Sequence, residues 1–571
     1  MNTEPYKCTV LDISGLSYAD RLTAGCLQGL ANRQGPRLFL NYGVYDDPEA
    51  RRTNEDFLPD EIWFKKFRPY LGNQDEHNLA YYRSLYDFEI EEAGDLDAAV
   101  RLFCPLLKGL VVWDLSFPDT ANPALVLAGQ EDLLVVTSEQ AGWAQETFGL
   151  QVKHNLCGRW DDRIRLYEWA FKELFPCCKE GFIACVEPGW HRPEFTDYLV
   201  QNRIFTYSLS SVAASRTFKL GQTLLLLLVG GPFGLRNLLF NFHLDGVVKR
   251  LGLWLMGSGS PETRLATTFQ RAVKSRPYPT IFGWHTRRDD ELAFMLLLSA
   301  NGLRLLPSHL ASNFSFHSKL PPKVRFQQEH LQPDDVTLEE KVYLTFTLSD
   351  GDQLVLMDTA ELGNWRREER GKIPFNWETQ PLLVEIAPAL LGQYYQTRTP
   401  NDYLIAGPSG AGYIIPPLNG SLQAYLEETA RICKLADISL FTPYIGDPPK
   451  RIMKQYGRVP GDFLGFIGGY AHFGRTPKYL TGGKAFIAYT WPYYKNVWDE
   501  SEQVLAAVQS QIEASGPLPR FVSAHLFAYK TTLKDIYEFV QGLDPGKVKV
   551  VRADEFVLAA RKYLEGKGDQ I

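Results

Sequence analysis

Apolar runs alternate with amphipathic segments along most of the chain, and this alternation predicts parallel sheets covered by helices. In the first half, strand-like runs at residues 9–13 and 37–40 flank a helical pattern over residues 17–33, which opens on a serine able to cap it. The pattern returns with strand-like runs at residues 109–113 and 133–137. Strand–helix–strand alternation is typical of α/β folds, because consecutive parallel strands need a crossover between them.

From residue 278 onward the alternation becomes regular, with about eight strand-like runs, several of them followed by helical patterns. This rhythm over such a length predicts a (β/α) barrel-like domain, and a distorted seven-stranded barrel would give the same pattern. An open doubly wound sheet is the structural alternative. The strand-like runs are residues 279–283, 303–306, 342–348, 403–406, 464–467, 485–489, 521–524 and 548–551.

The composition of the chain changes at residues 257–276, where Gly-Ser-Gly-Ser-Pro is followed by a polar stretch with a helical pattern. Gly and Ser in this density are typical of a connection between domains. We therefore expect a linker here, between an N-terminal α/β domain (residues 1–256, which could divide into two near residue 105) and a barrel-like domain (residues 277–571). The barrel-like domain is the one expected to bear the chemistry.

Bulk composition excludes several classes of protein. The net charge is only -7 over 571 residues, and no basic run with interleaved aromatics suggests a nucleic-acid partner. The most apolar run, residues 224–229, is far shorter than the roughly 20 residues of a membrane span. No export leader is visible, so we expect a cytoplasmic protein, or an extracellular one if a leader was removed. The oligomeric state is left open.

The 8 cysteines are scattered, so free thiols are expected and neither a disulfide framework nor a cofactor is indicated. A zinc site from Cys177, Cys178 and Cys185 with His191 lacks the usual paired spacing. We therefore predict no metal and no cofactor.

The chain's sharpest acidic motif lies where a predicted strand ends. The run at residues 342–348 continues into Ser-Asp-Gly-Asp-Gln, which places Asp350 and Asp352 two positions apart around a glycine. In a barrel the catalytic groups follow the strands, so both acids could face one cleft. An ordinary Asp-Gly turn, with the acids accepting backbone hydrogen bonds, is the alternative.

Three further acids are candidates. Asp290 and Glu291 open a helical pattern after the run at residues 279–283, where acids also offset the helix dipole. Glu385 stands inside an apolar run, where burial would raise its pKa and suit it to donate a proton. A solvent-facing position on an amphipathic helix is the alternative for Glu385.

Aromatic residues make up 13% of the chain, and several stand where a sugar ring could stack on them. Tyr413 is held in a loop, residues 407–416, that is rich in glycine and proline and should present the ring in one pose. Trp284 and Trp491 follow predicted strands, as does His525. Core packing is the alternative for each aromatic residue.

A metal-dependent site is a second possibility for the same strand ends. His285, His317, His472 and His525 could gather an ion with Asp350 or Asp352, which would activate a water molecule. No His-x-x-x-His pair supports this site, so the ligands would have to converge through the fold.

The loop Gly410-Ala411-Gly412-Tyr413-Ile414-Ile415-Pro416 resembles the signature of the GxGYxYP family of putative glycoside hydrolases, with Ile415 in place of the second tyrosine. The resemblance extends over both the N-terminal and C-terminal family domains. One departure is Gln353, where the family's acidic motif usually continues with asparagine. Other stretches that carry the resemblance are residues 27–33, 197–200, 283–284, 290–291, 299–302, Asn313 and 349–352.

The resemblance implies an enzyme that acts on carbohydrate, and glycoside hydrolysis needs two carboxyl groups in different protonation states. We expect Asp350 or Asp352 as the nucleophile or base and Glu291 or Glu385 as the acid. This hypothesis requires the acidic turn and Tyr413 to share one cavity. A metal-dependent carbohydrate deacetylase and a non-catalytic carbohydrate-binding protein remain alternatives. The substrate would be held by Trp284, Asp290, Asn313, Tyr413, Trp491 and His525.

Overall fold

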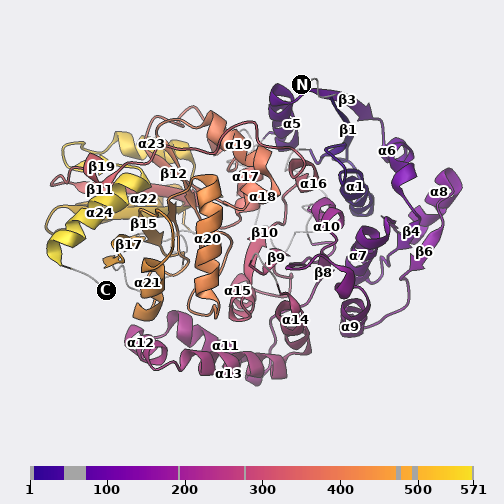
Figure 1. The fold of residues 1–571 in the computed structure, drawn as a ribbon, viewed down its shortest axis with the longest axis horizontal. Coiled ribbons are helices and arrows are strands. Elements are labelled where there is room, and N and C mark those ends of the chain that lie inside the picture. The colour runs from indigo at the N-terminus through magenta and orange to yellow at the C-terminus, as the bar shows by residue number, and fades with distance from the viewer. Residues whose placement is uncertain are drawn as a thin grey trace.

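The computed structural model describes residues 5–43, 72–190, 193, 195–274, 278–470, 478–490 and 499–568. Four sheets, with helices packed around them, form the described part of the protein (Figure 1). All strand pairs between named strands are parallel except β16 with β17. The predicted α/β class is confirmed.

Two small parallel sheets lie at the N-terminal end, in the orders β2-β1-β3 and β5-β4-β6. Helix α1 (Tyr18–Ala31) begins after Ser17, whose hydroxyl accepts from the backbone N–H of Asp20, as the serine cap predicted. The strands are β1 (Tyr6–Asp12), β2 (Leu38–Asn41), β3 (Phe88–Ala93), β4 (Leu110–Val112), β5 (Leu134–Val136) and β6 (Val152–Asn155). The other helices here are α5 (Gln74–Leu85), α6 (Leu96–Phe103), α7 (Ala121–Glu131), α8 (Ser138–Phe148) and α9 (Arg163–Glu173).

The third sheet joins strands from both halves of the chain, in the order β10-β9-β7-β8. Strands β9 (Thr280–Gly283) and β10 (Arg304–Pro307) were expected in the barrel, and that assignment is wrong, because β9 pairs with β7 (Phe182–Cys185). A short buried apolar run does not specify which sheet it enters. The remaining elements are β8 (Phe205–Tyr207), α10 (Thr196–Asn202), α15 (Glu291–Ala300) and α16 (Phe314–His317).

The stretch expected to be a linker is helical. Helix α13 (Asp245–Gly259) continues through the Gly-Ser-Gly segment, and α14 (Pro261–Ala272) follows after Ser260 caps it. A Cβ on Gly259 would stand 2.3 Å from Ser215 Oγ, so this glycine permits close packing instead of supplying flexibility. Helices α11 (Arg216–Gly230) and α12 (Phe233–Asn241) complete a helical layer along the lower edge of Figure 1.

No helix among the described residues is both long and apolar enough to cross a membrane alone. Helices α11 and α12 meet that length and composition only as a pair, and they are bent by 95° where they join.

The fourth sheet is the barrel-like domain. Its order is β16-β17-β15-β14-β13-β12-β11-β18, with β19 beside the start of β11. The sheet curls until the backbone N–H of Thr490, just after β17, donates to Ser523 O of β18 at 2.9 Å. The barrel-like expectation is thus confirmed as a curled half-barrel. Its strands are β11 (Val342–Ser349), β12 (Phe375–Thr379), β13 (Asp402–Ala406), β14 (Leu440–Phe441), β15 (Gly465–Gly468), β16 (Lys478–Thr481), β17 (Lys484–Ala488), β18 (Arg520–Phe527) and β19 (Val548–Val550).

Helices pack around the half-barrel (Figure 1). The helices are α17 (Gln353–Asp358), α18 (Leu383–Ile386), α19 (Pro388–Thr397), α20 (Leu422–Ala436), α21 (Lys450–Gly457), α22 (Ser501–Glu513), α23 (Leu533–Gln541) and α24 (Ala553–Lys567).

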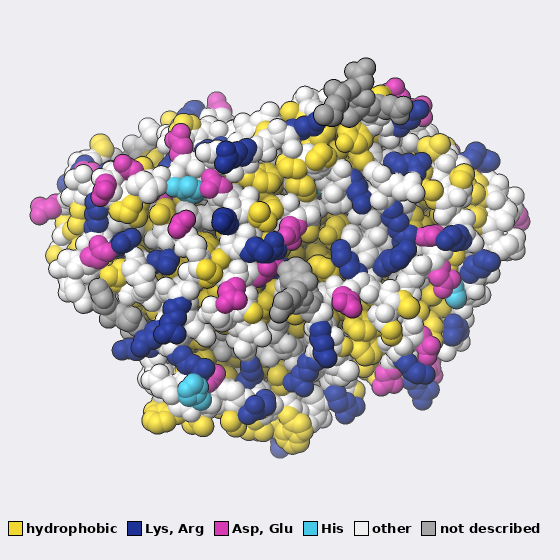
Figure 2. Space-filling model, in the orientation of Figure 1, with side chains coloured by type: hydrophobic (Ala, Val, Ile, Leu, Met, Phe, Trp, Pro, Cys, Tyr) yellow, Lys and Arg dark blue, Asp and Glu magenta, His cyan; other side chains and the backbone are white. Residues whose placement is uncertain are grey.

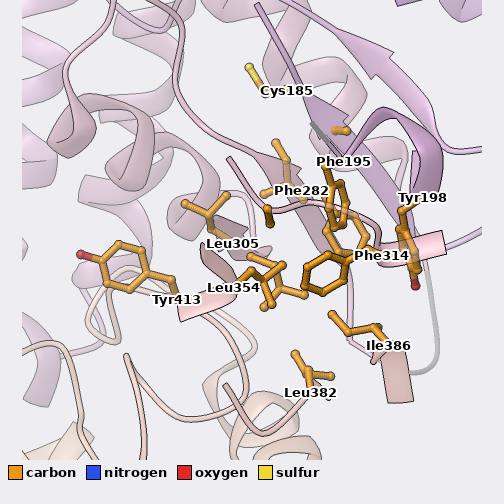
Figure 3. Close-up of a cluster of buried hydrophobic side chains, with 14 of the residues drawn as sticks. Cys185, Phe195, Tyr198, Phe282, Leu305, Phe314, Leu354, Leu382, Ile386 and Tyr413 are labelled. Carbon is orange, nitrogen blue, oxygen red and sulfur yellow. The ribbon is translucent and has the colours of Figure 1, made fainter. Parts of the chain in front are cut away.

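One hydrophobic core runs without interruption from the N-terminal sheets into the half-barrel. In Figure 3, Phe195 and Phe282 of the third-sheet region lie near Leu354 and Leu382 of the barrel region. Phe195 packs between β9 and α16, since its ring is 5.3 Å from that of Phe282 and 5.2 Å from that of Phe314. The halves therefore share buried apolar surface, which favours a fixed arrangement of the sheets.

Hydrogen bonds of the Asn313 side chain link the first sheet to the third-sheet region. Its side-chain oxygen accepts from Gln28 Nε2 at 2.6 Å and from the backbone N–H of Leu40 at 2.9 Å. Its amide nitrogen donates to Leu40 O at 2.8 Å and to Asp75 Oδ1 at 2.9 Å. Because the side chain is fully buried and all these groups lie away from water, the network is structural.

We expect Asn313→Ala to lower the free energy of unfolding by about 2–4 kcal/mol, because several buried polar groups would lose their partner. Denaturant unfolding measures the change, and Asn241→Ala at an exposed position is the control, expected within about 0.5 kcal/mol of wild type. An Asn313→Ala protein as stable as the control would contradict this role.

Candidate functional site

The acidic turn at the end of β11 packs against two tyrosines. Gly351 has a φ of 88°, in the left-handed region that favours glycine. A Cβ at this position would be 3.6 Å from Tyr470 Cε1 and 3.8 Å from Tyr413 Cζ. The turn therefore lies directly on both rings, and Asp352 follows it as the first residue before α17.

Tyr413 is positioned by backbone pairing with the third sheet. Its N–H donates to Leu305 O at 2.8 Å, and its carbonyl accepts from the Leu305 N–H at 2.9 Å. Figure 3 shows the phenol oxygen pointing away from the apolar cluster that contains Leu305. That hydroxyl donates to Glu291 Oε1 at 3.0 Å. A glutamate at the start of α15 is thereby joined to the loop of the barrel.

Glu291 and Asp352 are electrostatically coupled. Burial, and after it the nearby charge of Asp352, raise the pKa of Glu291 to about 7, although the hydrogen bond from Tyr413 acts in the opposite direction. Asp352 is buried, with its Oδ2 3.5 Å from His309 Nε2. Its Oδ1 has no hydrogen-bond partner among the described residues. The pair thus supplies a carboxyl group that holds a proton near neutral pH beside a second carboxyl group.

A hollow lined by His309 adjoins this pair. The indole of Trp284 stacks on His309, with ring centroids 5.1 Å apart and an interplanar angle of 27°. Burial lowers the pKa of His285 to about 4, which keeps this imidazole neutral at physiological pH. Glu291 and Asp352 do not line the hollow themselves. Its polar and aromatic lining includes Glu187, Trp190, Trp284, His285, Ser308 and His309.

A third carboxylate, Glu378, stands near the end of β12 and was missed by the sequence analysis. It is fully buried and accepts from the hydroxyls of Thr442 and Tyr470. Burial by itself would raise its pKa, but hydrogen bonds and the adjacent His525 (Nε2 to Oε2, 3.6 Å) outweigh burial and lower it. The only signal in the sequence was an acid within Phe-Asn-Trp-Glu-Thr, too short and polar a run to be recognised as a strand.

Tyr470 connects the two carboxylate groups. Its hydroxyl contacts Glu378 and lies 2.7 Å from Ser349 Oγ of the acidic turn. Its ring is 6.1 Å from that of Tyr413 and stacks on Tyr444 at 6.0 Å and 7°. The ends of β11, β12, β14, β15 and β18 therefore meet around one buried group of acids and aromatic rings.

The structure brings some of the predicted residues together. Glu291, Asp352 and Tyr413 form one cluster, and Trp284 reaches it through His309. His525 belongs to the Glu378 group, where its ring stacks on Tyr489 at 4.7 Å. Asp350 is half-buried on the acidic turn, next to Asp352.

Other predicted residues lie in different surroundings. Asp290 is exposed and caps α15 by accepting from the Ala293 N–H at 2.7 Å. The expected burial of Glu385 is not found, because its side chain is 37% exposed and pairs with Arg431 at 2.9 Å. The apolar run around it forms only the four-residue helix α18, which turns this side chain outward. Asn313 belongs to the structural network described above, and Trp491 lies outside the described residues.

The described residues contain no group of three or more His, Cys, Asp or Glu side chains placed to hold a metal ion. Of the four histidines considered for such a site, His317 is buried against Tyr82, with its Nδ1 2.8 Å from the hydroxyl oxygen. His472 and His191 lie outside the described residues.

Comparison with known proteins gives two family matches. Residues 340–561 match the model described as "GxGYxYP putative glycoside hydrolase C-terminal domain", and residues 107–178 match "GxGYxYP_N second domain". Together the two models match just over half of the chain. No curated protein matches.

Among solved structures, the chain is similar to a "putative hydrolase from Bacteroides thetaiotaomicron VPI-5482". The TM-score is 0.74 and the sequence identity 18%, over 98% of this chain and 96% of the other. At this identity the similarity shows a shared fold along the whole chain.

Because the pKa of Glu291 is raised, we predict that the difference in stability between the wild-type protein and the Glu291→Gln variant depends on pH. An acid whose folded pKa exceeds its ordinary value of 4.5 stabilises the protein fully below pH 4.5, and that stability is lost as the pH rises through about 7. We therefore expect the unfolding free energy of Glu291→Gln, relative to wild type, to increase by up to about 3 kcal/mol across this window.

Chemical denaturation at several pH values measures this difference. Glu385→Gln, which removes a surface carboxylate paired with Arg431, is the matched control and should show no comparable increase. A Glu291→Gln difference that stays constant with pH would show that Glu291 is not held protonated.

Proposed function

The protein belongs to the GxGYxYP putative glycoside hydrolase family, and from this premise we propose that it hydrolyses a glycosidic bond, with Glu291 as the proton donor and Asp352 as the second carboxylate. The observation that supports these roles is the Tyr413–Glu291 hydrogen bond beside Asp352, in surroundings that hold a proton on Glu291 near neutral pH.

In the proposed reaction, Glu291 donates its proton to the glycosidic oxygen as the bond from that oxygen to the anomeric carbon breaks. Asp352 either attacks the anomeric carbon or removes a proton from the water that does so. In the first case Glu291, now ionised, accepts the proton of the water that releases the sugar. A carboxyl separation of about 5 Å would give retention, and one of about 6.5–9.5 Å inversion.

The residues around Glu291 and Asp352 suggest how a sugar would be bound and how the proton donor would be oriented. The Trp284–His309 stack borders the hollow, and its apolar faces suit the C–H face of a sugar ring. Tyr413 orients the Glu291 carboxyl by donating to Oε1, which leaves the other oxygen to hold the transferable proton. Glu378 and His525 act as positioning residues in this proposal, because they fix the hydroxyl of Tyr470 beneath the acidic turn.

Substitution of the two carboxylates separates their roles. On a glycoside with a poor leaving group, Glu291→Gln should lower kcat/KM by about 10²–10⁴-fold, because the leaving oxygen is no longer protonated. On a dinitrophenyl glycoside, whose leaving group needs no proton, the loss should be much smaller. Asp352→Asn should lower the rate on both substrates.

The assay begins with a screen of chromogenic glycosides and acetylated sugars, and Glu385→Gln is the control expected to retain activity. Release of acetate with no glycoside cleavage would favour a deacetylase. Sugar binding without turnover would favour a carbohydrate-binding protein. Either result, or full glycosidase activity in both Glu291→Gln and Asp352→Asn, would overturn the proposed roles.

A further inference from the structure

Helices α11, α12 and α13 present an apolar outer face that no described element covers. Of the 13 large hydrophobic side chains exposed among the described residues, 8 lie within this segment of the chain. Phe242 and Trp254 are the most exposed, at 69% and 65%. We call this surface the helical face, and it consists of Leu220, Leu235, Leu238, Phe242, Leu244, Val247, Leu251 and Trp254.

The helical face lies on the side of the helical layer that does not pack against the described part of the protein. On α13, Val247, Leu251 and Trp254 recur at helical spacing and form one stripe. The opposite side of α13 packs against α11, where Gly221 and Gly252 allow the helices to touch (a Cβ on Gly221 would be 2.5 Å from Gly252 O). Figure 2 shows hydrophobic side chains along the lower edge, with Lys and Arg among them, where Figure 1 places these helices.

The charge of this layer is opposite to that of the whole protein. Residues 216–259 contain five Lys or Arg, of which Arg236 is buried and paired with Asp447, and a single acid, Asp245, whereas the chain has a net charge of -7. Asp245 is paired with Arg451. The exposed cations Arg216, Lys219 and Arg250 form no ion pair with another described residue, and Lys219 and Arg250 adjoin Leu220 and Leu251 of the face.

This charge pattern distinguishes between partners. A second copy of the chain docked through the same face would bring like charges together, which disfavours self-association. An anionic lipid surface offers negative headgroups to the cations and an apolar layer to the leucines, phenylalanine and tryptophan. Tryptophan is also the residue that membrane interfaces favour.

We propose that the helical face docks the protein on an anionic membrane surface, with Phe242 and Trp254 inserted at the headgroup boundary and Arg216, Lys219 and Arg250 on the lipid phosphates. The helices lie in the plane of the interface. This inference is independent of the proposed hydrolase chemistry, because none of these residues belongs to the Glu291–Asp352 cluster.

Co-sedimentation with vesicles tests the proposal. The 571-residue protein should bind vesicles of equimolar phosphatidylcholine and phosphatidylglycerol, bind phosphatidylcholine alone at least roughly tenfold more weakly, and dissociate as salt is raised. The double variant Phe242→Ser/Trp254→Ser and the triple variant Arg216→Gln/Lys219→Gln/Arg250→Gln should each lose binding. Leu102→Ser/Leu115→Ser removes exposed leucines elsewhere and should bind as wild type does.

Circular dichroism and thermal melts confirm that each variant folds, as expected for exposed positions. No binding to either vesicle by wild type would overturn the proposal. Equal loss of binding in the Leu102/Leu115 control would show that the attachment is not specific to this face. A concentration-dependent dimer in sedimentation velocity that Phe242→Ser/Trp254→Ser converts to monomer would assign the face to self-association instead.

Discussion

Two backbone hydrogen bonds between Leu305 and Tyr413 join the third sheet to the half-barrel, and the geometry of the candidate site depends on them. Without this bridge, the Tyr413 hydroxyl would not be held against Glu291, which stands at the start of the helix between β9 and β10. The bridge is backbone pairing, so it fixes the loop independently of most side chains. The continuous hydrophobic core then resists any sliding of one sheet past the other.

The site also shows how surroundings give identical groups different proton affinities. Burial next to Asp352 favours the neutral form of Glu291. Glu378 is buried as deeply as any residue, yet hydroxyl donors and an imidazole favour its charged form. A carboxyl group enclosed beside another acid with one hydroxyl donor tends to keep its proton, and one enclosed with several donors and an imidazole tends to lose it. The tyrosines link these two environments, because Tyr413 donates to one and Tyr470 to the other.

Much of the fold was predictable from the sequence, because local signals decide it. The serine cap of α1 and the glycines around Tyr413 each determine structure within a few residues. The partner sheet of β9 was not predictable, since a four-residue apolar run pairs equally well with either neighbour. Glu378 was missed because β12 is half polar, and its polar atoms face donors from strands distant in sequence. The surface position of Glu385 follows from the four-residue length of α18, which hydrophobic periodicity does not resolve.

The placement of Glu291 outside the half-barrel has a consequence for how such proteins can diversify. Residues 340–561, which match the C-terminal family model, contain Asp352 and Tyr413 but not the glutamate that Tyr413 contacts. A gene fusion that transferred only this segment to another protein would leave the acidic turn without its neighbour. A fusion that keeps the contact between Tyr413 and Glu291 would therefore have to carry the segment from β9 to β10 together with the barrel.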